Sequence, residues 1–174
     1  MTVRDGDTEL DGMVVMAVDA GVSTGVAVGV VDNEDFTLVR FDQFIEDDYL
    51  KTAQRLASIA REYKVETVVT ERFDLRPGNK FLADLTTVQV NAAFRALGWY
   101  DDIVEQTPAQ AKGLVSDNVL KRLGWWVTGK QVNYKDANDV RDALRHLVYY
   151  GVRTLKLKNL TKEGWNYDNV QGDA

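Results

Sequence analysis

The stretch "MVVMAVDAGVSTGVAVGVV" (residues 13–31) decides the fold of this chain. It holds two apolar, β-rich runs, "MVVMAVDA" and "GVAVGVV", on either side of "GVST", and so predicts two strands joined by a tight turn. One carboxylate, Asp19, lies in the middle of the stretch. Because a charge among apolar residues is costly unless another group binds it, the rest of the chain must supply a partner for Asp19.

Three further runs complete a predicted five-stranded sheet. "FTLVRFDQF" (36–44) follows a short polar turn and extends an antiparallel meander, whereas "VETVVTE" (65–71) and "DIVEQT" (102–107) alternate with helical patterns. Strands first and alternating helix and strand afterwards predict an α/β fold. Its mixed sheet has three antiparallel strands, then parallel ones, with helices on both faces. The predicted helices span residues 47–64, 80–98, 108–124 and 135–151, the last ended by Gly151.

The length of 174 residues, with 45% hydrophobic and 28% charged content, suits one well-formed core. Residues 1–12 are acidic and polar and predict a flexible leader. The globular domain is expected over 13–158, followed by a polar C-terminal tail over 159–174.

Composition also limits the compartment and the class of site. The chain has no cysteine, which excludes disulfides and thiolate metal sites and favours a reducing compartment, the cytoplasm. The acidic N-terminus does not resemble a signal peptide, and no apolar run reaches about 18 residues, so no membrane association is expected.

The charge is distributed unevenly. The net charge is −6, but residues 112–162 carry eleven Lys or Arg against four acids, 11 − 4 = +7. A basic segment on an acidic chain is compatible with a surface that faces phosphates, and equally with an ordinary solvated surface.

Carboxylates follow the predicted strands and enter the last helix. Asp19 and Glu71 each end a strand, and the ends of parallel neighbours meet at one edge of a sheet. On the last helix, Asp139, Asp142 and His146 share one face. Oxygen ligands without cysteine suit Mg²⁺ or Mn²⁺ better than zinc, and two such ions would support phosphodiester hydrolysis.

Each of these residues also has an ordinary structural explanation. Asp19 could form a turn with its own backbone, and Glu71 could pair with Arg72 or Arg76. Asp136 is expected to cap the last helix rather than to bind metal. The acids of that helix could be solvated, and a lone histidine is more often structural than catalytic.

Taken together, the motifs "VDAGVSTGVAV", "VVTERF", "TPAQAK" and "DVRDALRH" resemble the RuvC-like Holliday junction resolvases of the RNase H-like superfamily, particularly the short bacteriophage versions. The resemblance implies that Asp19, Glu71, Asp139 and Asp142 hold two divalent ions, Mg²⁺ or Mn²⁺. A second register, with Asp136 and Asp139 as the helix pair, stays open. His146 fits the pattern of the preferred register and is a candidate catalytic residue, and Lys112 matches a lysine near the scissile phosphate.

The resemblance further implies a homodimer that acts on four-way DNA, cuts two strands of like polarity and leaves ligatable nicks with 5′ phosphates. The helix over 80–98, apolar on more than one face, is the expected dimer contact. Phe73 resembles an aromatic residue pushed against junction bases, and it could also fold back onto the core. Trp125, Trp126 and Tyr134 could stack on unpaired bases, although at least one of the two tryptophans is expected to be buried. The candidate DNA-binding residues are Phe73, Arg76, Lys80, Lys112, Lys121, Lys130 and Lys135.

Three other functions compete. An actin-like or sugar-kinase ATPase would need a second, duplicated half, and only one such strand-turn element is found in these 174 residues. A nuclease of the same superfamily that processes pre-ribosomal RNA would have similar carboxylates. A protein that binds branched DNA without cleaving it would gain nothing from acids at the contact. Substrates other than four-way junctions, such as forks, stay open.

Overall fold

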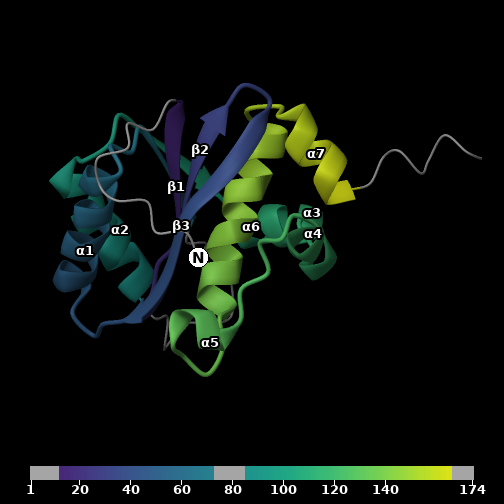
Figure 1. Ribbon diagram of the computed structural model, residues 1–174. Coiled ribbons are helices and arrows are strands. Elements are labelled where there is room, and N and C mark those ends of the chain that lie inside the picture. Colours follow the sequence, from purple (N-terminus) through teal and green to yellow (C-terminus); the bar gives the residue numbers. More distant parts are fainter. Residues whose placement is uncertain (1–11, 73–84, 166–174) are drawn as a thin grey trace, which may run out of the picture.

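The computed structural model describes residues 12–72 and 85–165. Five strands form one sheet in the order β3-β2-β1-β4-β5 (Figure 1). The first three pair antiparallel, and β1, β4 and β5 pair parallel, as the sequence predicts. The strands are β1 (Met13–Asp19), β2 (Ser23–Asp32), β3 (Asp35–Ile45), β4 (Thr67–Glu71) and β5 (Asp102–Gln106).

Helices cover both faces of the sheet. In Figure 1, α1 and α2 lie on one side, and α6 with α3, α4 and α7 lies on the other. The helices are α1 (Tyr49–Glu62), α2 (Thr86–Leu97), α3 (Pro108–Leu114), α4 (Asp117–Arg122), α5 (Gly129–Val132), α6 (Asn138–Arg153) and α7 (Lys158–Trp165). None of the helices in the described ranges combines the length and apolar composition that a bilayer span requires.

Strand alternation divides the core into two layers. On β1, Met16 and Val18 pack with α1 and α2, whereas Val15 and Ala17 pack with α6. Because side chains alternate along a strand, Asp19 belongs to the α6 side. Val69 of β4 also packs on that side, so Glu71, two residues later, shares it.

Several predicted helix limits are wrong. The helix predicted over 80–98 is not helical at Leu85 and is α2 from Thr86, and the helix predicted over 135–151 begins at Asn138. The segment predicted as one helix over 108–124 is two helices, because Ser116 caps α4 by accepting the N–H of Val119. The last helix does not end at Gly151 but continues to Arg153. Gly151 serves close packing instead, since a Cβ there would lie 2.6 Å from Leu160 and 2.9 Å from Phe36.

The described residues include one residue of the predicted leader and the first part of the predicted tail. Of the predicted leader, only Gly12 lies within the described residues. The predicted polar tail begins inside α7, and both Leu157, just before this helix, and Leu160, within it, are buried against the core. Residues 159–165 therefore pack on the domain as an amphipathic helix.

Candidate active site

Asp19 and Glu71 lie side by side at one edge of the sheet. The parallel pairing of β1 with β4 places Val18 opposite Thr70, and the two carboxylates are the next residues of each strand. The turn after Asp19 is held by Thr24, whose hydroxyl donates to the carbonyl of Gly21 (2.8 Å) and accepts its N–H (3.3 Å). That turn does not need the Asp19 side chain.

The N-terminal end of α6 is fixed against the sheet at this same edge. A Cβ on Gly25, which pairs with Asp19, would lie 2.1 Å from the carbonyl carbon of Asp139, so only glycine permits this approach. The hydroxyl of Ser23 donates to the Asp139 carboxylate at 2.5 Å. Gln43 of β3 accepts the N–H of Val140 at 3.3 Å and thereby caps a helix whose own N-cap residue has no side-chain hydrogen bond.

The electrostatics of Asp19 show that four carboxylates gather here. Burial raises the pKa of Asp19 to about 8, and the negative charges of Glu71, Asp142 and Asp139 add to the shift, while Lys112 opposes it. Asp136 does not contribute to this shift. It is exposed and precedes the N-cap residue Ala137, and its carboxylate accepts the N–H of Asn138, the first residue of α6, at 3.2 Å.

Two cations bind Asp142. Lys112 Nζ lies 2.8 Å from Asp142 Oδ2, and this hydrogen bond is the main reason that the pKa of Lys112 is raised. Arg145 pairs with Asp142 from the next turn of α6, pairs with Asp117, and donates to the carbonyl of Val115 (3.2 Å). These residues line an open hollow of about 610 Å³ beside the carboxylates.

His146 lies behind Glu71 rather than at the surface. Its side chain is 1% exposed, Nδ1 is 2.9 Å from Gln106 Oε1, and Nε2 is 3.5 Å from Glu71 Oε2. A histidine this buried orients the carboxylate it faces more readily than it touches a substrate.

Helix α2 holds both strand ends through their backbones. The hydroxyl of Thr87 donates to the carbonyl of Ala20 at 2.6 Å, directly after Asp19. The side-chain amide of Asn91 donates to the carbonyl of Glu71 at 3.3 Å. With Gln43, Ser23 and Arg145, these are site-supporting residues that the sequence patterns did not single out.

The donor set fits a hard divalent cation by its chemistry. Four carboxylates share a partly buried edge, where burial first and their mutual repulsion second raise the pKa of Asp19, and a cation would favour the charged form of all four. Across residues 12–72 and 85–165, however, no three Asp, Glu or His side chains are arranged to hold an ion. Instead Asp139 bonds to Ser23, and Asp142 bonds to Lys112 and Arg145, so metal binding would require these side chains to turn.

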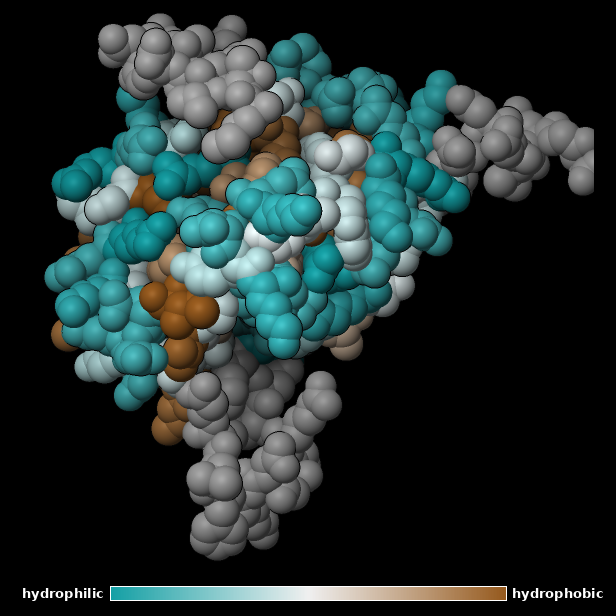
Figure 2. All heavy atoms as spheres, turned by 60° about the horizontal axis from the view of Figure 1, so that its bottom comes forward, coloured by the Kyte–Doolittle hydropathy of each residue, from teal (hydrophilic) through white to brown (hydrophobic). Residues whose placement is uncertain are grey.

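The candidate DNA-binding residues divide between this edge and regions that the structure does not describe. Phe73, Arg76 and Lys80 lie outside the described residues. Lys130 and Lys135 are exposed: Lys130 lies in the short helix α5 and Lys135 follows it, next to the start of α6 (Figure 1). Figure 2 brings this end of the molecule toward the viewer and shows mainly hydrophilic side chains, with smaller apolar areas.

The two adjacent tryptophans have different surroundings. Trp125 packs edge-on against Phe36 at 6.3 Å and joins the core. Trp126 lies between Lys121 (4.7 Å) and Arg141 (4.4 Å) in two cation–π contacts. Both are partly buried, so neither is fully removed from solvent.

No model of a known protein family matches the chain, and no curated protein sequence is detectably similar. Solved structures do share its fold. Thermus thermophilus RuvC matches with a TM-score of 0.61 and 15% identity over 83% of this chain and 98% of that one. Its complex with a Holliday junction substrate matches at 0.59 and 15%, over 82% and 96%. The fowlpox virus resolvase bound to substrate Holliday junction DNA matches at 0.56 and 13%, over 80% and 97%. The chain therefore has the RuvC-like resolvase fold, which confirms the α/β, five-stranded architecture predicted from its sequence.

Proposed function

We propose that this protein is a metal-dependent endonuclease that cleaves four-way DNA junctions. The supporting observation is the gathering of Asp139, Asp142 and Glu71 around Asp19, with Lys112 beside them, in a RuvC-like fold. Two proteins that share this fold, T. thermophilus RuvC and the fowlpox virus resolvase, are solved with Holliday junction DNA.

The four carboxylates Asp19, Glu71, Asp139 and Asp142 would hold the metal, Mg²⁺ or Mn²⁺, as two ions in each site. Bound there, divalent ions supply activation of the attacking water and stabilisation of the leaving oxygen. The chain itself contributes rigidity. β1 and β4 fix two carboxylates, α6 carries the other two, and Gln43 holds the start of α6 to β3.

Lys112 is the residue of this site best placed to bind the scissile phosphate. Its side chain is half-exposed, and its ammonium already lies against the carboxylate group through Asp142. A fixed ammonium offsets negative charge that develops on phosphoryl oxygens. Arg145 is less exposed and has further partners in Asp117 and Val115, so it keeps Asp142 and the start of α4 in place.

Symmetric nicking of a junction requires two sites, and we propose that a homodimer provides them through α2. The helix buries only Val90 and Phe94 in its own domain. Leu85 and Val88 are 50% and 41% exposed, and Ala92 and Ala96 continue this apolar stripe at helical spacing. Thr87 and Asn91 of the same helix bond to the two strand ends, so a dimer contact on α2 would lie next to each site.

The experiment uses a synthetic four-way junction labelled on each strand, incubated with Mg²⁺ or Mn²⁺. The wild type is expected to give paired nicks with 5′ phosphates, and Asp19→Asn is expected to bind without cutting. Asp136→Asn is the matched control, an acid two residues before α6 that is exposed and outside the cluster. Loss of cutting in Asp136→Asn but not in Asp142→Asn would show that Asp136 and Asp139, rather than Asp139 and Asp142, are the pair of metal ligands near the start of α6.

Three results would contradict the proposal. Junction binding without cleavage in either metal would identify a non-cleaving DNA-binding protein. Cleavage of structured RNA in preference to the junction would identify an RNA-processing nuclease of the same fold. Cuts that persist in Asp19→Asn would reject the assigned site.

A further inference from the structure

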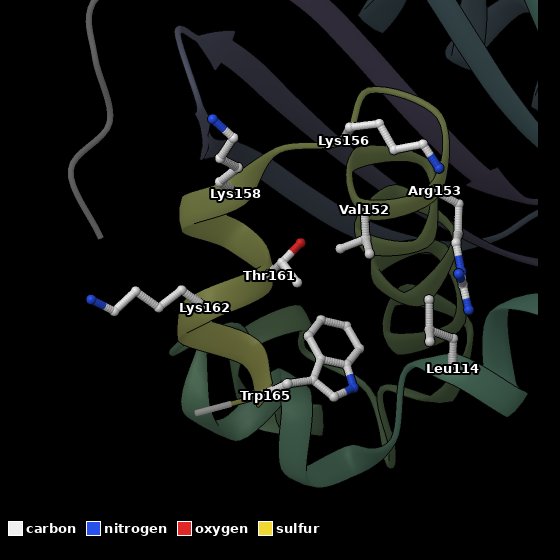
Figure 3. Close-up of a pocket in the computed structure, with 8 residues that line it drawn as sticks. All are labelled: Leu114, Val152, Arg153, Lys156, Lys158, Thr161, Lys162 and Trp165. Atoms are coloured by element: carbon white, nitrogen blue, oxygen red, sulfur yellow. The ribbon is translucent and has the colours of Figure 1, made fainter. Parts of the chain in front are cut away.

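A basic groove lies at the opposite end of α6 from the carboxylates. It has a volume of about 450 Å³ and is formed where the C-terminal ends of α3 and α6 meet α7 (Figure 3). Its lining residues are Leu114, Val152, Arg153, Lys156, Lys158, Thr161, Lys162 and Trp165. None of these described lining residues is acidic.

The cations lie on two sides of the groove. Figure 3 shows Arg153 and Lys156 on the α6 side, whereas Lys158 and Lys162 lie on α7 with side chains that extend away from the Trp165 indole. Glu34 pairs with Lys158 at 2.8 Å and compensates part of this charge. Arg153 and Lys156, three residues apart, are therefore the cations that can face a ligand in the groove, and they would attract an anionic group such as a phosphodiester backbone.

The floor of the groove is apolar and aromatic. Leu114, Val152 and Trp165 supply it, and Figure 3 shows the Trp165 indole between α7 and the ends of the other two helices. A DNA duplex would present only its backbone to this groove, because its bases are paired and stacked and could not stack on Trp165. An unpaired strand presents base faces as well, and grooves for single strands combine cations with an aromatic stacking surface.

The groove is close enough to the carboxylates to serve the same substrate. Asp142 and Arg153 are 153 − 142 = 11 residues apart on α6, about 16 Å along its axis. Helix α3 connects the two places, because Lys112 pairs with Asp142 and Leu114 lines the groove.

We propose that this groove binds an unpaired, single-stranded arm of a branched DNA substrate, with its phosphates on Arg153 and Lys156 and one base on Trp165. The proposal rests on the proposed function in taking DNA as the substrate. It extends that function to forks and flaps that carry a single-stranded arm.

The binding test measures the fluorescence anisotropy of a labelled oligothymidylate with the full chain in EDTA, where no cleavage occurs. The double variant Arg153→Gln, Lys156→Gln is expected to weaken binding about tenfold. The salt dependence of its binding should correspond to about two fewer phosphate contacts than in the wild type. Lys51→Gln with Lys64→Gln is the matched control. It removes two exposed charges on the α1 side, and Lys64, like Lys156, has a positive φ. This control is expected to bind as the wild type does.

A second variant tests stacking separately from charge. Trp165→Leu keeps apolar volume at the groove but removes the aromatic face, and is expected to weaken oligothymidylate binding at least about fivefold. Circular dichroism and thermal melting establish that α7 stays folded. Equal binding by the wild type and both groove variants would overturn the proposal. The proposal would also be overturned if the wild type bound an acidic peptide more tightly than oligothymidylate and the groove variants lost that binding. The same holds if the groove variants lost as much affinity for blunt duplex DNA as for oligothymidylate.

Cleavage assays separate this proposal from the proposed function. Groove variants are expected to cut a fork with a single-stranded arm several-fold more slowly than the wild type, and to cut an all-duplex four-way junction at the wild-type rate. If the wild type cuts no branched DNA but loses oligothymidylate binding in the groove variants, the nuclease function fails and the single-strand site stands. If the wild type cuts junctions and the groove variants behave as the wild type on both substrates, the nuclease function stands and the single-strand site fails.

Discussion

Gln43 of β3 caps helix α6 from across the domain: its Oε1 accepts the N–H of Val140 (3.3 Å), and its Nε2 donates to the carbonyl of Asp136 (3.4 Å). Gln43 and Val140 are both buried, so the N–H of Val140 has no water as a ready substitute for this acceptor. This contact fixes the turn of α6 that carries Asp139.

Replacement of Gln43 by leucine leaves a buried N–H without an acceptor. We expect Gln43→Leu to lower the free energy of unfolding by about 1–3 kcal/mol, measured by urea denaturation, and to slow junction cleavage. Gln43→Glu keeps both the acceptor for Val140 and a donor for Asp136 when its carboxyl group is protonated, and is expected to lose less stability at acidic than at neutral pH. Equal stability of wild type and Gln43→Leu would show that the cap is not needed.

Gly25 sets how closely α6 approaches the sheet. A Cβ there would lie 2.1 Å from both the carbonyl carbon and oxygen of Asp139, and backbone atoms cannot yield as a flexible side chain can. We expect Gly25→Ala to destabilise the fold by more than about 2 kcal/mol and to abolish cleavage.

Gly113→Ala is the matched control for this substitution. Gly113 lies in α3, where an added Cβ would have no heavy atom within 4 Å, and alanine favours a helix over glycine by up to about 1 kcal/mol. Thermal melting of the two variants provides the comparison. A wild-type melting temperature for Gly25→Ala would mean that α6 can shift without cost.

The sequence predicts the sheet and its two strand-ending carboxylates because those signals are local. Apolar runs locate β1 and β4, and their parallel pairing brings Asp19 to Glu71. Gln43 and Asn91 could not be found in this way. Each is a polar residue in an ordinary pattern whose partner lies far along the chain, at Val140 and Glu71, and such contacts exist only after folding.

Gly151 shows how contacts between distant elements can also make a local sequence rule fail. A glycine near the end of a helical pattern predicts a C-cap, but Gly151 is placed by Phe36 of β3 and Leu160 of α7 packing against it. Packing from distant elements therefore outweighed the local rule, and α6 runs two residues further.

The apolar stripe on α2 makes a prediction about assembly. We expect Val88→Glu to raise the dimer dissociation constant at least about tenfold, because it buries a charge in a helix contact. Light scattering after size-exclusion chromatography measures the mass in solution. Leu97→Glu, half a helical turn away from Val88 around α2 and also exposed, is the control expected to stay dimeric. A monomeric wild type at micromolar concentration would contradict this prediction.

Lys112 is expected to matter for catalysis far more than for folding. It is half-exposed, so loss of its ion pair with Asp142 in Lys112→Met should change the free energy of unfolding by less than about 1 kcal/mol. Loss of charge stabilisation at the phosphate should slow single-turnover junction cleavage by about 10²–10³-fold. Lys51→Met, an exposed lysine on α1, is the control. A cleavage rate within twofold of wild type would remove Lys112 from the site.

The raised pKa of Asp19 predicts how metal-free stability depends on pH. The folded chain holds a proton on Asp19 up to about pH 8, whereas the ordinary pKa is 3.8, so between these values the folded state binds more protons than the unfolded state. The free energy of unfolding contributed by Asp19 therefore falls as pH rises through this window, by about 1.4 kcal/mol per unit of pH at most.

Asparagine cannot ionise, so Asp19→Asn removes this pH dependence. In EDTA we expect the variant to be more stable than the wild type near pH 8, by up to several kcal/mol, and similar to it near pH 4. Urea denaturation at both values measures the difference, with Asp136→Asn as the control acid outside the cluster. Because a bound cation favours the charged form of Asp19, Mg²⁺ at pH 8 should raise the melting temperature of the wild type more than that of Asp19→Asn. A variant less stable than the wild type at pH 8 in EDTA would contradict the raised pKa of Asp19.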